Sequence, residues 1–332
     1  MYTRLTLFGI FVIFISSELT HAQSFKQENP LAHTYSIVAR DPVTGDMAVG
    51  VQSHWFSVGT VVSWGEAGLG VIATQSFVNK SFGIRGLALL KEGKTPQEAL
   101  EILLSTDAGK AVRQVSILDK HGQIATHTGD LCIKFAGHII GKDFSVQANM
   151  MLNDQVWPKM AQAYEAADSL PLAERVLQAM KGAQAAGGDI RGQQSASILV
   201  IKGVSENKPW DERLIDLRVD DSKDPLAELE RLLKVYRAYE HMNNGDLAVE
   251  KNDMPLASLE YQKAEEMFPD NLEMKYWHAI TLLNNGDIQT ASDMLLAVFK
   301  KDENWRKLTA RLPASGILQL SEKDLNYILN LK

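Results

Sequence analysis

The sequence contains one cysteine and fewer basic than acidic residues. Cys132 is the only cysteine in 332 residues, so the chain cannot form an internal disulfide. Its apolar neighbours Leu131 and Ile133 favour a packing role over a catalytic one. The chain carries 34 Lys and Arg against 41 Asp and Glu, a net charge of −7. No run of basic residues is present to neutralise phosphates, so we expect no nucleic-acid partner.

The sequence also lacks the common motifs of metal and cofactor chemistry. No HExxH, CxxC or GxSxG pattern occurs. His54, His127 and His138 could meet in space, but we interpret each as an ordinary polar residue. A GxGxxA match at residues 68–73 continues as an apolar strand instead of opening a helix, so it does not predict a dinucleotide site. We therefore expect no metal and no cofactor.

Long apolar runs are absent except at the N-terminus. Arg4 precedes an apolar stretch at residues 5–15, and Thr20-His21-Ala22 offers small residues for cleavage after Ala22. This pattern predicts a signal peptide over residues 1–22 and a secreted or periplasmic protein. The stretch is shorter than the roughly 20 residues that a membrane-spanning helix needs, so we expect no transmembrane segment.

The rest of the chain predicts strands and helices in separate groups. β-rich runs favour strands at residues 35–40, 47–53, 60–64, 69–75, 115–118, 123–127, 144–149, 197–202 and 214–219. Apolar periodicity favours helices at residues 83–91, 156–167 and 172–181, and others that begin at Thr95 and Pro225. Thr95 and Glu98 have the spacing of a capping box around Pro96. Separate runs of strands and helices indicate an α+β fold.

Six motifs in one order resemble the family called domain of unknown function 1028, which is grouped with the N-terminal-nucleophile (Ntn) hydrolase-like proteins. They lie at residues 34–41, 73–79, 83–86, 146–150, 187–196 and 216–221. The resemblance implies an αββα four-layer sandwich. We predict a leader at residues 23–33, the Ntn-like domain at 34–236 and an all-α domain at 237–332.

The resemblance also implies a mechanism. In Ntn hydrolases the nucleophile is the first residue of the mature chain, and its own α-amine, with a pKa of about 7.7–8.0, is the base. Thr34, at the head of an apolar strand, takes this position. Asn149 and backbone N–H groups of the glycine-rich loop are candidate oxyanion donors, and Asp189 and Ser195 are candidates for orienting the amine. Candidate substrate-binding residues are Ser53, Gln75, Asn79, Arg191 and Gln194.

Each of these residues also has a purely structural interpretation. Thr34 can be an ordinary strand residue, because threonine favours strands. Asp189 and Arg191 can form a local ion pair that closes a loop. The amide side chains can be structural hydrogen-bonding groups, at Gln75, Asn79, Gln147 and Asn149.

The leader decides whether Thr34 can act. Cleavage after Ala22 leaves residues 23–33 ahead of Thr34, whose nitrogen then belongs to a peptide bond and cannot be a base. A second cleavage at His33–Thr34 is required, and Ntn precursors often make it through attack of the hydroxyl on the preceding carbonyl. Without it, the domain is a binding fold or an inactive relative.

The C-terminal part has its own 34-residue period. Gly245, Ala257, Tyr261, Ala264 and Pro269 have the spacing of a tetratricopeptide repeat. A second, degenerate copy follows at Ala279, Ala291, Leu295, Val298 and Glu303, with Gly286 at the turn between helices. The pattern favours either a docking surface for a protein or peptide, or a helical buttress for the main domain.

Two functions follow from these patterns. The first is a secreted amidohydrolase that uses Thr34 to cleave a peptide, an N-acyl compound or a cell-wall fragment. The alternative is a non-catalytic envelope protein that binds a ligand or partner through its cleft and its helical repeats.

Overall fold

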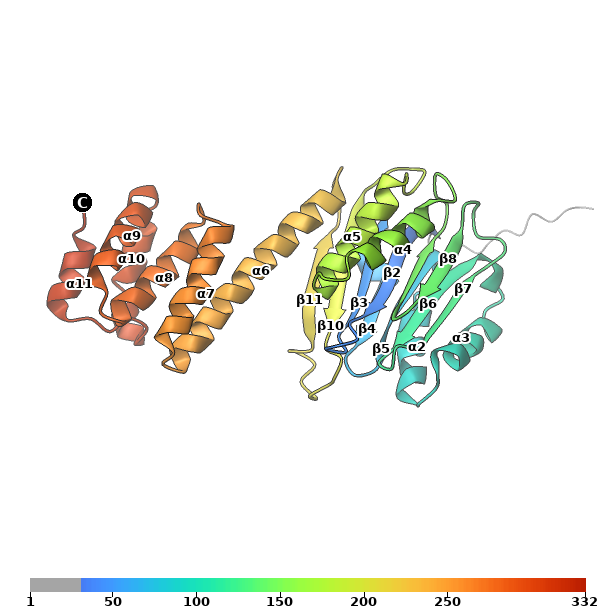
Figure 1. The fold of residues 1–332 in the computed structure, drawn as a ribbon, viewed down its shortest axis with the longest axis horizontal. Helices are drawn as coiled ribbons and strands as arrows, with labels where there is room; N and C mark the ends of the chain where they lie inside the picture. The colour runs from blue at the N-terminus through green and yellow to red at the C-terminus, as the bar shows by residue number, and fades with distance from the viewer. Residues whose placement is uncertain (1–30) are drawn as a thin grey trace, which may run out of the picture.

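The computed structural model describes residues 31–332, which form a sandwich of two sheets followed by a helical region (Figure 1). Sheet B contains β2 (Thr34–Arg40), β3 (Met47–Ser53), β8 (Gly137–Gly141), β9 (Phe144–Ala148), β10 (Ser195–Ile201) and β11 (Arg213–Val219). Its strand order is β11-β10-β3-β2-β9-β8, and all neighbours are antiparallel. Thr34 therefore begins a central strand.

The five-stranded sheet A is also antiparallel. It contains β1 (Leu31–Ala32), β4 (Ser63–Glu66), β5 (Gly70–Phe77), β6 (Arg113–Asp119) and β7 (Ile124–Thr128). The order is β1-β5-β6-β7, and β4 also pairs with β5. The chain passes directly from β1 in sheet A to β2 in sheet B, so the peptide bond before Thr34 lies where the two sheets meet.

Helices cover the outer face of each sheet (Figure 1). Helices α2 (Ser81–Lys91) and α3 (Pro96–Ser105) share an apolar core with sheet A. Helices α4 (Val156–Ala166), α5 (Leu172–Ala185) and the first half of α6 (Pro225–Glu250) share another with sheet B. A third core lies between the sheets. The predicted α+β fold with four αββα layers is therefore confirmed.

Alternating side chains on β2 explain why this strand is buried on both faces. Tyr35, Ile37 and Ala39 pack in the core under α4 and α5, while Val38 packs between the sheets. Successive side chains on a strand point to opposite faces. Thr34, an even-numbered residue like Val38, therefore directs its side chain into the space between the sheets.

Most predicted elements are present, with three differences. Strand β1 lies in the predicted leader, where no strand was expected. Residues 60–64 were expected to be a strand, but Gly59–Val62 form the short helix α1 and only Ser63 and Trp64 enter β4. Strand β8 was not predicted. The capping box is confirmed, since Thr95 Oγ1 accepts from Glu98 N at 3.2 Å and Glu98 Oε2 accepts from Thr95 N at 2.8 Å. Residues 70–77 form β5, so the GxGxxA match opens no helix.

A helical region extends away from the sandwich (Figure 1). After α6 come α7 (Met254–Met267), α8 (Leu272–Asn284), α9 (Ile288–Lys301), α10 (Asn304–Thr309) and α11 (Glu322–Leu329). Gly286 has a positive φ of 86° in the turn between α8 and α9. The small and apolar repeat positions are buried, at Ala257, Tyr261, Ala264, Ala279, Ala291, Leu295 and Val298. The assignment to tetratricopeptide repeats remains a prediction.

The predicted signal peptide and all but the last three residues of the leader lie outside the described residues. Over residues 31–332, no helix combines the length and apolar character that a membrane crossing demands. Helix α6 runs without a break across the domain boundary predicted at residues 236–237.

Candidate active site

The start of β2 lies in a row of three hydroxyl residues on adjacent strands. Thr34 pairs with Ser53 on β3, and Ser53 pairs with Ser195 on β10. Paired residues of antiparallel strands direct their side chains to the same face. The exposed fraction is 0% for Thr34 and 1% for His33. The His33–Thr34 peptide bond is therefore enclosed by protein.

Two side chains donate to the carbonyl oxygen of His33. The Ser53 hydroxyl lies 2.5 Å from this oxygen and the Arg191 Nη2 lies 2.8 Å from it. We call Ser53 Oγ and Arg191 Nη2 the donor pair. One donor is a hydroxyl and the other a cation, so both polarise the carbonyl in the direction that attack on its carbon requires.

Asp189 fixes Arg191 in this position. Its carboxylate accepts from Arg191 Nε at 3.0 Å and from Nη2 at 2.6 Å, and its side chain is fully buried. It also accepts from the backbone N–H of Arg191 at 2.9 Å and of His54 at 3.3 Å. The loop at residues 187–194 thus carries a part-buried ion pair, as one sequence interpretation expected. This pair presents a guanidinium N–H to the His33 carbonyl.

A second group of donors surrounds the carbonyl oxygen of Thr34. It accepts from Gln75 Nε2 at 3.1 Å, from Asn149 N at 3.1 Å and from Asn149 Nδ2 at 3.4 Å. Gln75 and Asn149 also donate to Gln114 Oε1 at 2.7 and 2.9 Å. Gln114 was missed in the sequence, where its only signal is a polar residue directly before the strand predicted at residues 115–118.

The imidazole of His33 fills the space beside the donor pair. Its Nδ1 lies 2.8 Å from Asn149 Oδ1, and its ring meets Phe77 edge-on, with centroids 5.5 Å apart at 86°. Burial lowers the pKa of His33, the hydrogen bond to Asn149 opposes this shift, and the nearby Arg191 charge adds to it. The ring is therefore neutral at pH 7. Its Nε2 is buried and has no hydrogen-bond partner among the described residues.

Three predicted site residues bond elsewhere. The Ser195 hydroxyl donates to the Trp55 carbonyl and accepts from Val58 N at 3.0 Å, which holds the loop after β3. Asn79 accepts from the backbone N–H of Ser81, the first residue of α2, and donates to Asp107, both at 3.1 Å. Gln194 donates to Asp221 at the surface. The structure thus gathers the other six around the His33–Thr34 bond, namely Thr34, Ser53, Gln75, Asn149, Asp189 and Arg191. The predicted roles of all nine remain predictions.

Of the three histidines named in the sequence, His127 and His138 make ordinary side-chain hydrogen bonds, and His54 bonds Asp189 through its backbone N–H. His127 Nε2 lies 2.9 Å from the Lys110 carbonyl oxygen, and His138 Nδ1 lies 2.9 Å from Thr128 Oγ1. Within residues 31–332 no cluster of three or more His, Cys, Asp or Glu side chains has an arrangement that could hold a metal ion.

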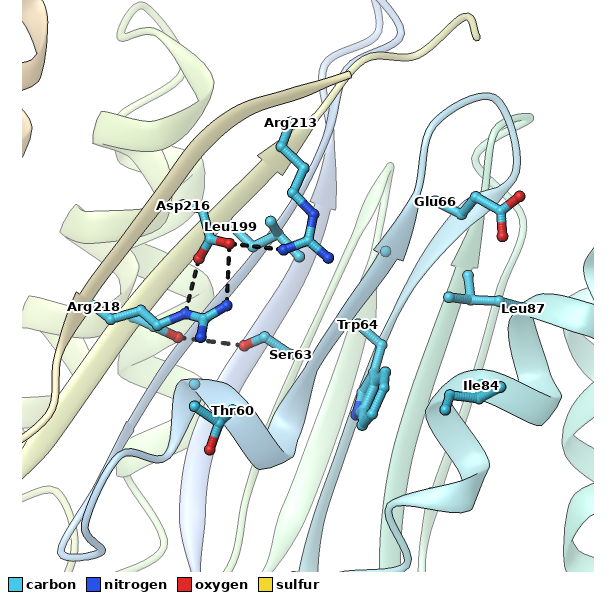
Figure 2. Close-up of a pocket in the computed structure, with 13 residues that line it drawn as sticks. Thr60, Ser63, Trp64, Glu66, Ile84, Leu87, Leu199, Arg213, Asp216 and Arg218 are labelled. Carbon is cyan, nitrogen blue, oxygen red and sulfur yellow. Dashed lines mark hydrogen bonds and ion pairs between the residues drawn. The ribbon is translucent and has the colours of Figure 1, made fainter. Parts of the chain in front are cut away.

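A separate cleft of about 380 Å³ opens between β11 and β4 (Figure 2). Two strands, β10 and β3, lie between β11 and β2. Arg213 and Arg218 both bond Asp216, at 2.8 to 3.0 Å, so this wall carries one net positive charge. Figure 2 shows an apolar wall opposite, formed by Trp64, Ile84 and Leu87. None of the predicted site residues lines this cleft.

The comparisons with known proteins agree on one family. A family model described as "Family of unknown function (DUF1028)" matches residues 34–229. The crystal structure of protein SPO2555 from Silicibacter pomeroyi, which bears the same family designation, is similar with 29% sequence identity and a TM-score of 0.56. The match covers 61% of this chain and 85% of that one. No curated protein matches significantly. The family match spans more than half of the chain, which therefore belongs to the DUF1028 family.

Proposed function

We propose that the protein is an amidohydrolase that matures by cleaving its own His33–Thr34 bond and then uses Thr34 as the nucleophile. The observation that carries this proposal is the donor pair. Ser53 and Arg191 bind the one carbonyl that the Thr34 hydroxyl would attack in the precursor. In a strand residue without a catalytic role, we would not expect the preceding carbonyl to accept from both a hydroxyl and a guanidinium that a fully buried carboxylate holds in place.

The self-cleavage proceeds as an acyl shift from nitrogen to oxygen. Thr34 Oγ attacks the His33 carbonyl carbon, and the negative charge that develops on the carbonyl oxygen is stabilised by the donor pair. The C–N bond breaks, and the proton from Oγ goes to the Thr34 nitrogen. An ester between His33 and Thr34 results. Water then hydrolyses this ester, which leaves a carboxylate on His33 and a free α-amine on Thr34.

The same groups then serve an external amide. The α-amine of Thr34, with a pKa of about 7.7–8.0, takes the proton from Oγ and later gives it to the leaving amine. The acyl group passes through an ester with Thr34, and water releases it. We propose secretion as well, on the basis of the apolar run near Arg4 and the small residues before Ala22.

The direct test is the mass of the mature chain. We expect the wild-type protein to begin at Thr34, and the Thr34→Ala variant to retain the residues before it. Thr34→Ser keeps a hydroxyl and should restore cleavage. A wild-type chain that keeps the His33–Thr34 bond after prolonged incubation would overturn the proposal.

A groove in the helical region supports the alternative, a binding function. It has a volume of about 760 Å³ and lies between α6, α8 and the segment before α11. Its lining combines polar Asp246 and Asn284 with the apolar surfaces of Trp277 and Ile317. If binding were the whole function, Thr34→Ala would leave both the N-terminus of the mature chain and partner binding unchanged.

A further inference from the structure

We propose that the space held by His33 and the two residues before it is the acyl-side subsite, and that the substrates are extended peptides with histidine on the acyl side of the cleaved bond. This inference rests on the proposed function, since it concerns the same nucleophile. It goes further by naming the class of amides that the site selects. The evidence is the contacts of His33 and the pairing of β1.

The first step of the argument is the position of the carbonyl. Self-cleavage and substrate cleavage are both attacks by Thr34 Oγ on a carbonyl carbon. Both need the developing oxyanion at the donor pair of Ser53 and Arg191. A substrate carbonyl must therefore lie where the His33 carbonyl lies, and its side chain must occupy the place of the His33 imidazole.

The second step is the hydrogen bond that this place demands. Gln114 Nε2 donates to the backbone carbonyls of Gly137 and Ala148, at 3.2 and 2.9 Å, so Gln114 presents its oxygen to Asn149. Asn149 must then direct Nδ2 to Gln114 at 2.9 Å and Oδ1 to the ring at 2.8 Å. Backbone carbonyls can only accept hydrogen bonds, so they determine which way the amide groups of Gln114 and Asn149 are turned.

It follows that the subsite recognises an N–H donor on a small neutral ring. Asn149 Oδ1 can only accept, so His33 Nδ1 carries the proton. The pKa of His33 is lowered mainly by burial, and the Arg191 charge acts in the same direction, so a cationic side chain is disfavoured there. Phe77 closes the subsite with an edge-on ring contact. A side chain without the donor would leave Asn149 Oδ1 buried and unpaired, which is costly.

The third step is the path of the peptide before the histidine. Leu31 and Ala32 pair with Phe77 and Ser76 as an antiparallel strand on β5. Departure of the leader would expose this part of the β5 edge, and an extended peptide can add to such an edge through backbone hydrogen bonds. The subsite therefore binds a peptide that runs in the same direction as β1, and it recognises the last side chain of that peptide.

The probe is the chain's own sequence at residues 29–33. Acetyl-Asn-Pro-Leu-Ala-His with a fluorogenic aminocoumarin amide is compared with peptides that carry leucine or 4-thiazolylalanine in place of histidine. Thiazolylalanine has a ring of the same size without the N–H. We expect kcat/KM of the processed protein to be higher for the histidine peptide by about tenfold or more, which is the loss expected for one buried hydrogen bond.

A variant tests the cause of the preference. In Asn149→Leu the ratio of kcat/KM between the histidine and leucine peptides should fall to about one or below. Asn243→Leu, the same change at an exposed position of α6, should keep the wild-type ratio.

The outcomes separate the two proposals. A wild-type chain that keeps the His33–Thr34 bond refutes the amidohydrolase and the subsite together. A processed chain that cleaves the leucine and thiazolylalanine peptides as fast as the histidine peptide refutes the subsite alone. Because the peptide series uses the wild-type protein, this comparison holds even where Asn149→Leu does not fold.

Discussion

At the scale of single residues, amide side chains fix one another's orientation around the His33–Thr34 bond. Gln114 orients Asn149 and Gln75, Asn149 orients the His33 ring, and Asp189 orients Arg191. The partners of the site residues, and not the site residues alone, therefore determine the geometry around the His33–Thr34 bond.

Loss of the hydroxyl donor should slow self-cleavage. We expect Ser53→Ala to reduce the rate by about 10²–10³-fold, the effect typical of removing one oxyanion donor. The measurement is a mass-spectrometric time course of the intact chain. Ser197→Ala removes a buried hydroxyl on neighbouring β10 that does not contact the His33 carbonyl, and it should cleave at the wild-type rate. Equal rates for the two variants would exclude Ser53 as a donor in the reaction.

His33 should make the uncleaved chain sensitive to acid. Its pKa is lowered from 6.5 in the folded state by burial, so the unfolded state binds a proton that the folded state does not. Stability is therefore lost as pH falls below 6.5. In the Thr34→Ala background, Tm should drop more between about pH 7.5 and about pH 5.5 than in Thr34→Ala/His33→Gln. Identical drops would contradict this assignment.

Sequence motifs predicted part of the site. Thr34, Asn149 and Arg191 lie in segments that carry the family resemblance, so they could be named without a structure. Gln114 and the His33 ring could not, because their partners come from strands far away in the sequence. Ser195 was predicted as a site residue because it precedes a predicted strand. Its hydroxyl instead donates to Trp55 in the loop after β3, and only the tertiary structure shows where that loop runs.

At the scale of elements, Gly50 allows α5 to lie close against β3. A Cβ atom at this position would lie 2.3 Å from Val176 Cγ1 and 2.8 Å from Met180 Sδ. We expect Gly50→Ala to lower the free energy of unfolding by about 1–3 kcal/mol, as overpacking typically does. Chemical denaturation measures this change. Adding Val176→Ala should recover part of the loss, and a double variant whose loss equals the sum of the two single losses would argue against a direct clash.

Elements with local signals were predicted best. The capping box at Thr95 fixes the start of α3 within four residues of sequence. Residues 60–62 were predicted wrongly as a strand because their β-forming side chains are outweighed by tertiary bonds. Ser195 binds Trp55 and Val58 across the sheet and holds the chain in a helical turn there.

At the scale of the whole molecule, α6 joins two hydrophobic cores. Leu226, Leu229 and Leu233 belong to the core of sheet B, while Ala238 and Met242 belong to the core of the helical region. Arg237 adds a bidentate ion pair from α6 to Glu174 on α5, at 2.8 and 2.9 Å. A continuous helix with both cores attached should transmit unfolding from one to the other.

Breaking α6 between the two cores should separate their unfolding. Proline in a helix interior costs roughly 3 kcal/mol and removes a backbone hydrogen bond, so we expect Tyr239→Pro to split a single calorimetric transition into two. Tyr239→Ala removes the hydroxyl bond to Glu273 but keeps the helix, and should retain one transition. One sharp transition in the proline variant would show that α6 does not couple the cores.

The burial of the bond before Thr34 determines the kinetic order of maturation. His33 and Thr34 are 1% and 0% exposed, so neither a second copy of this chain nor an added protease can reach the bond without local opening. The hydroxyl and the carbonyl are also neighbours in one chain. Maturation as we propose it is therefore unimolecular: its half-time should stay constant on dilution, and mixing with already mature protein should not accelerate it.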